Sequence, residues 1–96
     1  MSDVATRGNP RRHEMLVIND SDETPSLLNP LSGQVFVTNR VGKQVMELAD
    51  GSASLDDIVE AITRTFVGAP ADRVRQEVTT FLEESAQKGL IGWTGM

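Results

Sequence analysis

The sequence predicts an α+β domain in which a three-stranded antiparallel sheet is followed by three helices. Two observations support this class. Up to Val37 the apolar residues stand in short runs, as in strands, whereas beyond Asn39 they recur every three or four residues, as in helices. Because strands and helices occupy separate parts of the chain, the class is α+β. The 96 residues suit a single domain with one modest core.

The predicted strands are Met15–Ile18, Ser26–Leu28 and Val35–Val37. The first is a short apolar run with Val and Ile, bounded by charged segments. The second and third flank Asn29–Gly33, where proline fixes φ and glycine permits positive φ, so a hairpin is expected there. The acidic loop Asp20–Thr24 lacks the oxygen spacing of a calcium site and is predicted to be a solvated turn.

The first helix is predicted to follow Thr38 or Asn39, either of which is placed to act as its N-cap. Asp50–Gly51 ends it, because glycine adopts the left-handed conformation of a helix stop without strain. Its apolar side chains have helical spacing and are expected to face the core. They are Val41, Val45 and Leu48, with Met46 beside them.

The second helix opens at Ser54, which with Asp57 approximates a capping box. Gly68 ends this helix. Its apolar stripe consists of Leu55, Ile58, Val59, Ile62 and Phe66.

The third helix is predicted to begin at Pro70, which is tolerated in a first helical turn, and to end at Gly89. One flank carries Arg75 and Thr79, and the other carries Glu77 and Glu84. Its apolar stripe consists of Val74, Val78, Phe81 and Leu82, with Ser85 on the same face, and Leu90–Ile91 then return to the core.

Residues 1–13 show no hydrophobic period and contain Gly8, Pro10 and three arginines. A segment of this kind buries too little apolar surface to offset its ordering entropy, so it is predicted to be a flexible arm. The folded domain is accordingly predicted to span residues 14–93.

Composition excludes several classes of function. The chain has no cysteine and one histidine, His13 in the arm, so no metal site or cofactor is expected. No apolar run approaches the length of a membrane span and no signal-peptide core is present, which predicts a cytoplasmic protein. The net charge of −5 disfavours a nucleic-acid partner, because phosphate contacts dominate such binding.

Candidate catalytic residues have structural explanations. Asp56, Asp57 and Glu60 lie in the first turns of a helix, where the macrodipole favours negative charge. No partner base or nucleophile accompanies them, so the domain is predicted not to be an enzyme. The stretch around Ser54 resembles an acyl-carrier attachment site, but Ala53 replaces the expected Asp and strands precede it. An acyl-carrier-like protein is kept as the weaker alternative.

Helix, tight turn and helix around Gly51 also match the outline of a helix-turn-helix, so the shape is expected to be winged-helix-like. The third helix offers Arg73, Arg75 and Gln76 to a nucleic acid, but also carries Glu77, Glu83 and Glu84. A nucleic-acid-binding or regulatory winged helix therefore remains the first alternative.

The order of motifs from about Met15 to Trp93 resembles the PqqD family, the peptide chaperones also called RiPP precursor recognition elements. The resemblance lies in Leu27-Leu28-Asn29 before a turn with Gly33, in Asn39 and Gly42, and in Val45–Gly51, a helix ending in Leu-x-Asp-Gly. The second helix and the Val78…Phe81-Leu82…Gly89-Leu90-Ile91 close complete it.

The resemblance implies a non-catalytic domain that binds the leader of a ribosomally made precursor peptide. It also implies delivery of that peptide to a modifying enzyme, often a radical S-adenosylmethionine enzyme. Independently, so small a sheet has a free edge on which a peptide strand can add. If Val35–Thr38 is that edge, the peptide contacts are expected at Val35, Phe36, Val37, Thr38, Val74, Arg75, Val78, Phe81 and Leu82.

In this arrangement the third helix walls the groove, and Arg75 on its flank is expected to meet an acidic side chain of the leader. The face of the third strand that points inward is left open, because Phe36 and both neighbouring valines are apolar.

Overall fold

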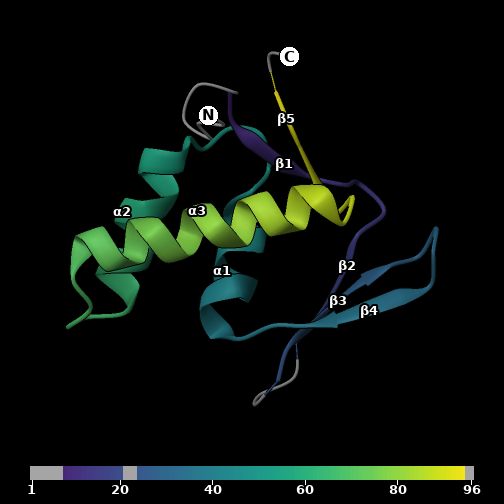
Figure 1. The fold of residues 1–96 in the computed structure, drawn as a ribbon, viewed down its shortest axis with the longest axis horizontal. Coiled ribbons are helices and arrows are strands. Elements are labelled where there is room, and N and C mark those ends of the chain that lie inside the picture. Colours follow the sequence, from purple (N-terminus) through teal and green to yellow (C-terminus); the bar gives the residue numbers. More distant parts are fainter. Residues whose placement is uncertain (1–7, 21–23, 95–96) are drawn as a thin grey trace.

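The computed structural model describes residues 8–20 and 24–94, and Figure 1 shows its fold. In chain order the elements are β1 (Pro10–Arg12), β2 (Val17–Asn19), β3 (Ser26–Asn29), β4 (Gln34–Val37), α1 (Arg40–Leu48), α2 (Leu55–Thr65), α3 (Ala71–Gln87) and β5 (Ile91–Trp93). The predicted α+β class, with its three strands followed by three helices, is confirmed, and two further strands are added near the ends of the described chain.

Strands β2, β3 and β4 form an antiparallel sheet in that order. The predicted hairpin joins β3 and β4, and Gly33 takes a positive φ of 75° in its turn. The first strand begins later than predicted, at Val17 instead of Met15. The reason is a tight turn in which the backbone N–H groups of Met15 and Leu16 donate to His13 Nδ1 and His13 O, at 3.0 and 2.9 Å.

Strands β1 and β5 form a separate two-stranded antiparallel ribbon. Figure 1 shows this ribbon above α3 in the view and the three-stranded sheet below it. Pro10–Arg12, which fall within the predicted flexible arm, thus form a strand, and residues 1–7 of that arm lie outside the described residues. Residues 21–23 of the predicted acidic turn also lie outside them.

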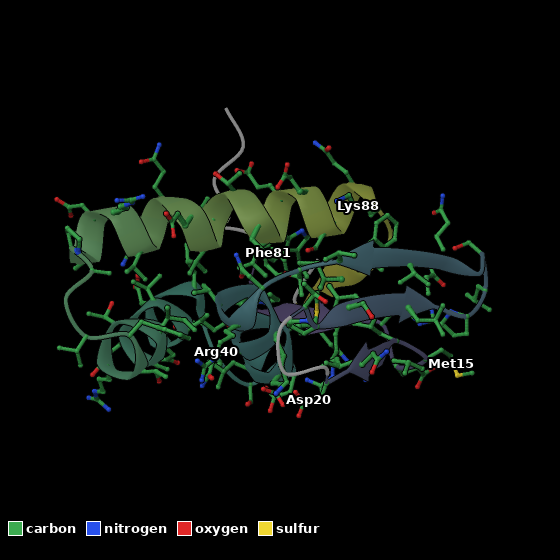
Figure 2. All side chains as sticks on the ribbon, turned by 90° about the horizontal axis from the view of Figure 1, so that it is seen from below. Met15, Asp20, Arg40, Phe81 and Lys88 are labelled. Atoms are coloured by element: carbon green, nitrogen blue, oxygen red, sulfur yellow. The ribbon has the colours of Figure 1, made fainter. Side chains whose placement is uncertain are left out.

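The core lies between the helices and the inner face of the three-stranded sheet. Figure 2 shows α3 as one layer and the sheet with α1 and α2 as the other. The predicted stripes supply most of the buried side chains, and Val41, Leu48, Phe66 and Phe81 pack against them while remaining partly exposed. The buried members are Leu27, Val45, Met46, Leu55, Ile58, Val59, Ile62, Val74, Val78, Leu82, Leu90 and Ile91.

Local signals set the helix ends. Asn39, one of the two predicted N-caps, accepts a hydrogen bond from the Gly42 N–H at 2.8 Å. Ser54 and Asp57 form the predicted reciprocal capping box. Gly51 takes a positive φ of 90° two residues beyond Ala49, the C-cap of α1. None of the helices in the described chain is long and apolar enough to cross a membrane.

Candidate functional site

Strand β4 forms one edge of the sheet, since among the described residues its only strand partner is β3. The Thr38 N–H donates to Pro25 O at 2.8 Å, which continues the β3–β4 register by one pair. Hydrogen-bonded pairs alternate along an antiparallel ladder, so Phe36 also bonds toward β3. The backbone N–H and C=O groups of Val35 and Val37 therefore point to the open edge.

The two faces of β4 differ. Phe36 packs partly buried against the core, and the Lys88 ammonium lies 4.9 Å from the centre of its ring. The side chains of Val35 and Val37 are 58% and 73% exposed on the opposite face. The question that the sequence left open is thus answered: Phe36 points inward, and the valines stay available to solvent or to a partner.

A groove of about 510 Å³ begins where β4 ends and runs between α1 and α3. Its apolar surface comes from Val41, Val45, Val78 and Phe81. Figure 2 shows Phe81 projecting from α3 toward the layer that contains the sheet and α1. The remaining lining residues are Thr38, Asn39, Gly42, Arg73, Gln76, Glu77, Thr80 and Glu84.

Gly42 sets the depth of the groove beside Phe81. A Cβ atom at position 42 would lie 1.9 Å from Thr38 Oγ1 and 3.0 Å from Phe81 Cε1, so any larger residue must displace one of these groups. The missing side chain therefore lets the Phe81 ring and Thr38 approach the first turn of α1.

The nine predicted site residues separate into three groups. The first group lies at the open edge or in the groove and consists of Val35, Phe36, Val37, Thr38, Val78 and Phe81. Val74 and Leu82 fill the core, with exposed fractions of 5% and 0%.

The third group is Arg75 alone, which does not line the groove. It lies on the other flank of α3, where its Nη2 contacts Asp56 Oδ1 of α2 at 2.5 Å. The groove instead faces the flank with Arg73, Gln76, Glu77, Thr80 and Glu84, which the sequence prediction left out of the site. Helical spacing could have grouped these residues, but not assigned them to the groove.

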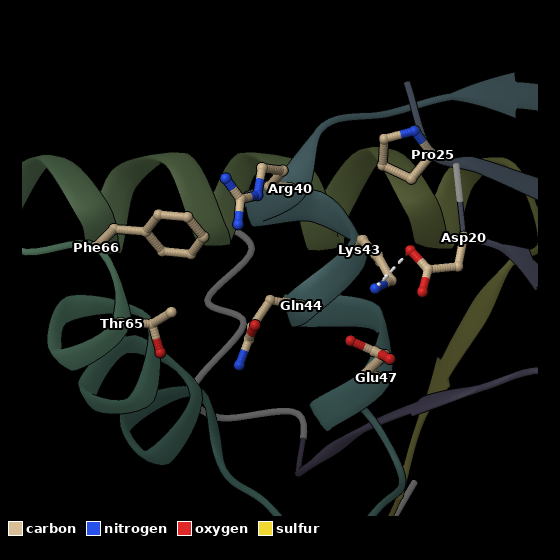
Figure 3. Close-up of a pocket in the computed structure, with 8 residues that line it drawn as sticks. All are labelled: Asp20, Pro25, Arg40, Lys43, Gln44, Glu47, Thr65 and Phe66. Atoms are coloured by element: carbon tan, nitrogen blue, oxygen red, sulfur yellow. Dashed lines mark ion pairs between the residues drawn. The ribbon is translucent and has the colours of Figure 1, made fainter. Parts of the chain in front are cut away.

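A smaller cavity of about 220 Å³ lies on the other side of α1, against the end of α2 (Figure 3). Lys43 contacts Asp20 there at 2.8 Å, and this hydrogen bond raises the pKa of Lys43 above its ordinary value. The lysine is therefore held as a cation by its own ion pair. Among the described residues, no group of His, Asp or Glu side chains is arranged to hold a metal ion.

The candidate catalytic residues are all engaged structurally. Ser54 Oγ accepts the Asp57 N–H at 3.1 Å, as an N-cap does. Asp56 is paired with Arg75, and Glu60 is paired with Arg64 one turn further along α2. These contacts give the acidic residues in the first turns of α2 structural roles, so no catalytic role is needed to explain them.

Three solved structures share this fold. One is "TbiB1 in Complex with the TbiA(beta) Leader Peptide", with a TM-score of 0.72, 23% identity, and coverage of 90% of this chain and 96% of that chain. Another is "Lasso peptide synthetase B1 complexed with the leader peptide", with a TM-score of 0.73, 13% identity, and coverage of 88% and 99%.

The third solved structure is the PqqD truncation of Methylobacterium extorquens PqqCD, described as a functional and stand-alone RiPP recognition element. Its TM-score is 0.71 and its identity 20%, and 86% of this chain covers 87% of it. Sequence comparison with curated proteins finds no match. The profile of the family "Coenzyme PQQ synthesis protein D (PqqD)" matches residues 26–91, from β3 to the first residue of β5. This chain belongs to the PqqD family, whose members are non-catalytic.

Proposed function

We propose that this domain binds the leader segment of a ribosomally synthesised precursor peptide as an added strand on β4. The observation that carries the proposal is the open β4 edge beside a groove walled by α3. The fold is also that of two proteins whose structures hold leader peptides.

The geometry suits an extended peptide. The N–H and C=O groups of Val35 and Val37, which meet no strand of the described residues, repeat every second residue. This is the spacing that a neighbouring strand presents. Side chains of an added strand alternate, so one set faces α3 and the apolar surface around Phe81, and the other set lies beside Val35 and Val37. Backbone bonds then provide affinity, and the groove provides selectivity.

A strand of about six residues buries less surface than a standard interface, so we expect a Kd on the order of micromolar. Such an affinity suits a domain that must hand its peptide on. Since the family is non-catalytic, the second partner is a peptide-modifying enzyme, and the family resemblance favours a radical S-adenosylmethionine enzyme. Reconstituting modification with the enzyme encoded beside a precursor gene, with and without this domain, tests that assignment.

The direct test of peptide binding is an NMR titration of the ¹⁵N-labelled domain with the leader of a precursor encoded next to it. We expect amide shifts concentrated on residues 35–38 and on the groove side of α3, residues 73–84. Shifts confined to residues 54–60, around the start of α2, would refute the proposed site. The Val37→Pro variant is the control, because it blocks the edge without touching the groove.

A further inference from the structure

We propose that Glu84 makes the groove select peptides that carry a basic side chain two residues from an apolar one. This inference rests on the proposed function and adds the chemistry of the peptide that the site prefers. The apolar side chain packs on Phe81, and the lysine or arginine reaches the Glu84 carboxylate.

Glu84 is a groove charge with no ion-pair partner among the described residues. Three charged residues are found among the described lining residues, namely Arg73, Glu77 and Glu84. Arg73 Nε donates to Glu77 Oε1 at 3.2 Å, so these two charges offset each other within α3. Glu84 has no ion pair with any described residue, and the α1 side of the groove contributes only neutral side chains.

The helical neighbour that is best placed to neutralise Glu84 is directed elsewhere. Lys88 lies four residues beyond it, a spacing at which Glu and Lys commonly pair. Here the Lys88 ammonium instead lies over the Phe36 ring, 4.9 Å from its centre. The Glu84 carboxylate is therefore left for a cation brought by the peptide.

The spacing of the two contacts follows from element geometry. Phe81 and Glu84 are both on the groove side of α3 and differ by about 4.5 Å along its axis, at about 1.5 Å per residue. In an added strand, side chains on one face recur every second residue, or about 6.6 Å. Long lysine and arginine side chains cover the difference, so the apolar and basic residues are expected at positions i and i+2, in one of the two directions.

The test uses display selection of random twelve-residue peptides against three immobilised proteins: the unaltered domain, Glu84→Lys and Glu83→Lys. Glu83 is the matched control, because its substitution changes the net charge equally but it does not line the groove. We expect the unaltered domain and Glu83→Lys to enrich lysine or arginine two residues from an apolar residue. Glu84→Lys should enrich aspartate or glutamate at that position.

In binding measurements on single selected peptides, replacing the basic residue with glutamine should weaken binding about two- to fivefold, the range for one exposed ion pair. This difference should shrink as salt is raised. An unchanged preference in Glu84→Lys, or the same switch in Glu83→Lys, would overturn the inference while leaving peptide binding in place. No enrichment above a Val37→Pro domain would overturn the proposed function as well.

Discussion

The two small sheets of this domain differ in whether an outer strand edge is hydrogen-bonded within the fold. Strand β1 has its outer edge closed by the end of α1: the Arg12 N–H donates to Ala49 O at 2.7 Å and the Gly51 N–H donates to Pro10 O at 3.1 Å. Strand β4 has an outer edge on which the backbone groups of Val35 and Val37 meet no described strand. One edge is paired within the fold, and the other is the edge on which we propose that the peptide adds.

The closed edge also supports the open one. No basic residue lies in the last turn of α1, and Arg12 supplies that charge from β1, with its Nη1 donating to Met46 O and Glu47 O at 3.2 and 3.0 Å. The other end of α1 carries Asn39 and Gly42, which line the groove. The ribbon therefore fixes the helix that forms one groove wall, so the comparison can be tested at either edge.

Proline substitutions in and beside β4 give the largest expected effects, because each removes one backbone N–H, either from the β3 side or from the open edge. Thr38→Pro removes the N–H that donates to Pro25 O, and we expect it to lower the free energy of unfolding by about 1–3 kcal/mol because a backbone acceptor loses its partner. Val37→Pro removes an outward N–H, which edge strands tolerate. It should leave stability within about 1 kcal/mol and weaken peptide binding at least tenfold, by our order-of-magnitude estimate.

Urea denaturation and peptide titration of both variants measure this pair. Equal destabilisation by the two prolines would show that the Val37 N–H does not face the open edge.

Arg12→Ala tests the closed edge. It leaves the carbonyls of Met46 and Glu47 without the guanidinium, and we expect a loss of about 1–2 kcal/mol in the free energy of unfolding. Arg11 is the control: its side chain is exposed, and Arg11→Ala should stay within about 0.5 kcal/mol. Chemical denaturation of both variants measures these changes in the free energy of unfolding. Similar losses in the two variants would mean that Arg12 does not act through these carbonyls.

What the sequence predicted well was local. The helices follow from their apolar period and from caps that lie three residues apart, such as Ser54 and Asp57. The ribbon was missed because Pro10–Arg12 has no apolar alternation. Its stabilisation comes from hydrogen bonds to residues more than 30 positions away, which no local pattern encodes.

The candidate site was also predicted only in part, because local patterns do not encode how distant elements pack. Periodicity gives the inward direction of α3, and its stripe residues Val74, Val78 and Leu82 are buried. The same three residues were predicted as peptide contacts, because the pattern does not separate core positions from groove positions. It does not say which flank faces β4. Arg75 was therefore chosen for the site, although the groove lies on the flank of Glu77 and Glu84. Only the packing of α3 against the sheet and α1 distinguishes the two flanks.

Gly42→Ala tests whether the shape of the groove beside the open edge matters for peptide binding. The new Cβ would meet Thr38 Oγ1 at 1.9 Å and Phe81 Cε1 at 3.0 Å, so the groove beside Phe81 must change shape. Alanine favours helix over glycine by about 0.5–1 kcal/mol, which offsets part of the strain. We expect stability to change by less than about 1 kcal/mol and peptide binding to weaken several-fold, roughly 1 kcal/mol.

A double-mutant cycle with Thr38→Ala is the control, because removing Oγ1 relieves the closest contact. Strictly additive effects of the two substitutions would argue against this contact as the cause.

The smallest expected effect lies at the turn that β1 covers. The Ser52 hydroxyl and backbone N–H donate to Asp50 Oδ1 at 2.6 and 2.9 Å, and these bonds lower the pKa of Asp50 below its ordinary value of 3.8. Between the folded and unfolded pKa values the unfolded chain binds more protons, so stability falls as the pH drops. The contribution is complete above about pH 4 and is lost as the pH falls through the folded pKa.

Ser52→Ala should therefore lower the urea midpoint slightly near neutral pH and reduce its decline below about pH 4. Asp50→Asn should remove that part of the decline, since the amide does not titrate. Urea midpoints measured across this range for all three proteins provide the comparison. If the Ser52→Ala and unaltered curves stay parallel below pH 4, then the Ser52 hydroxyl does not hold the carboxylate in its ionised form.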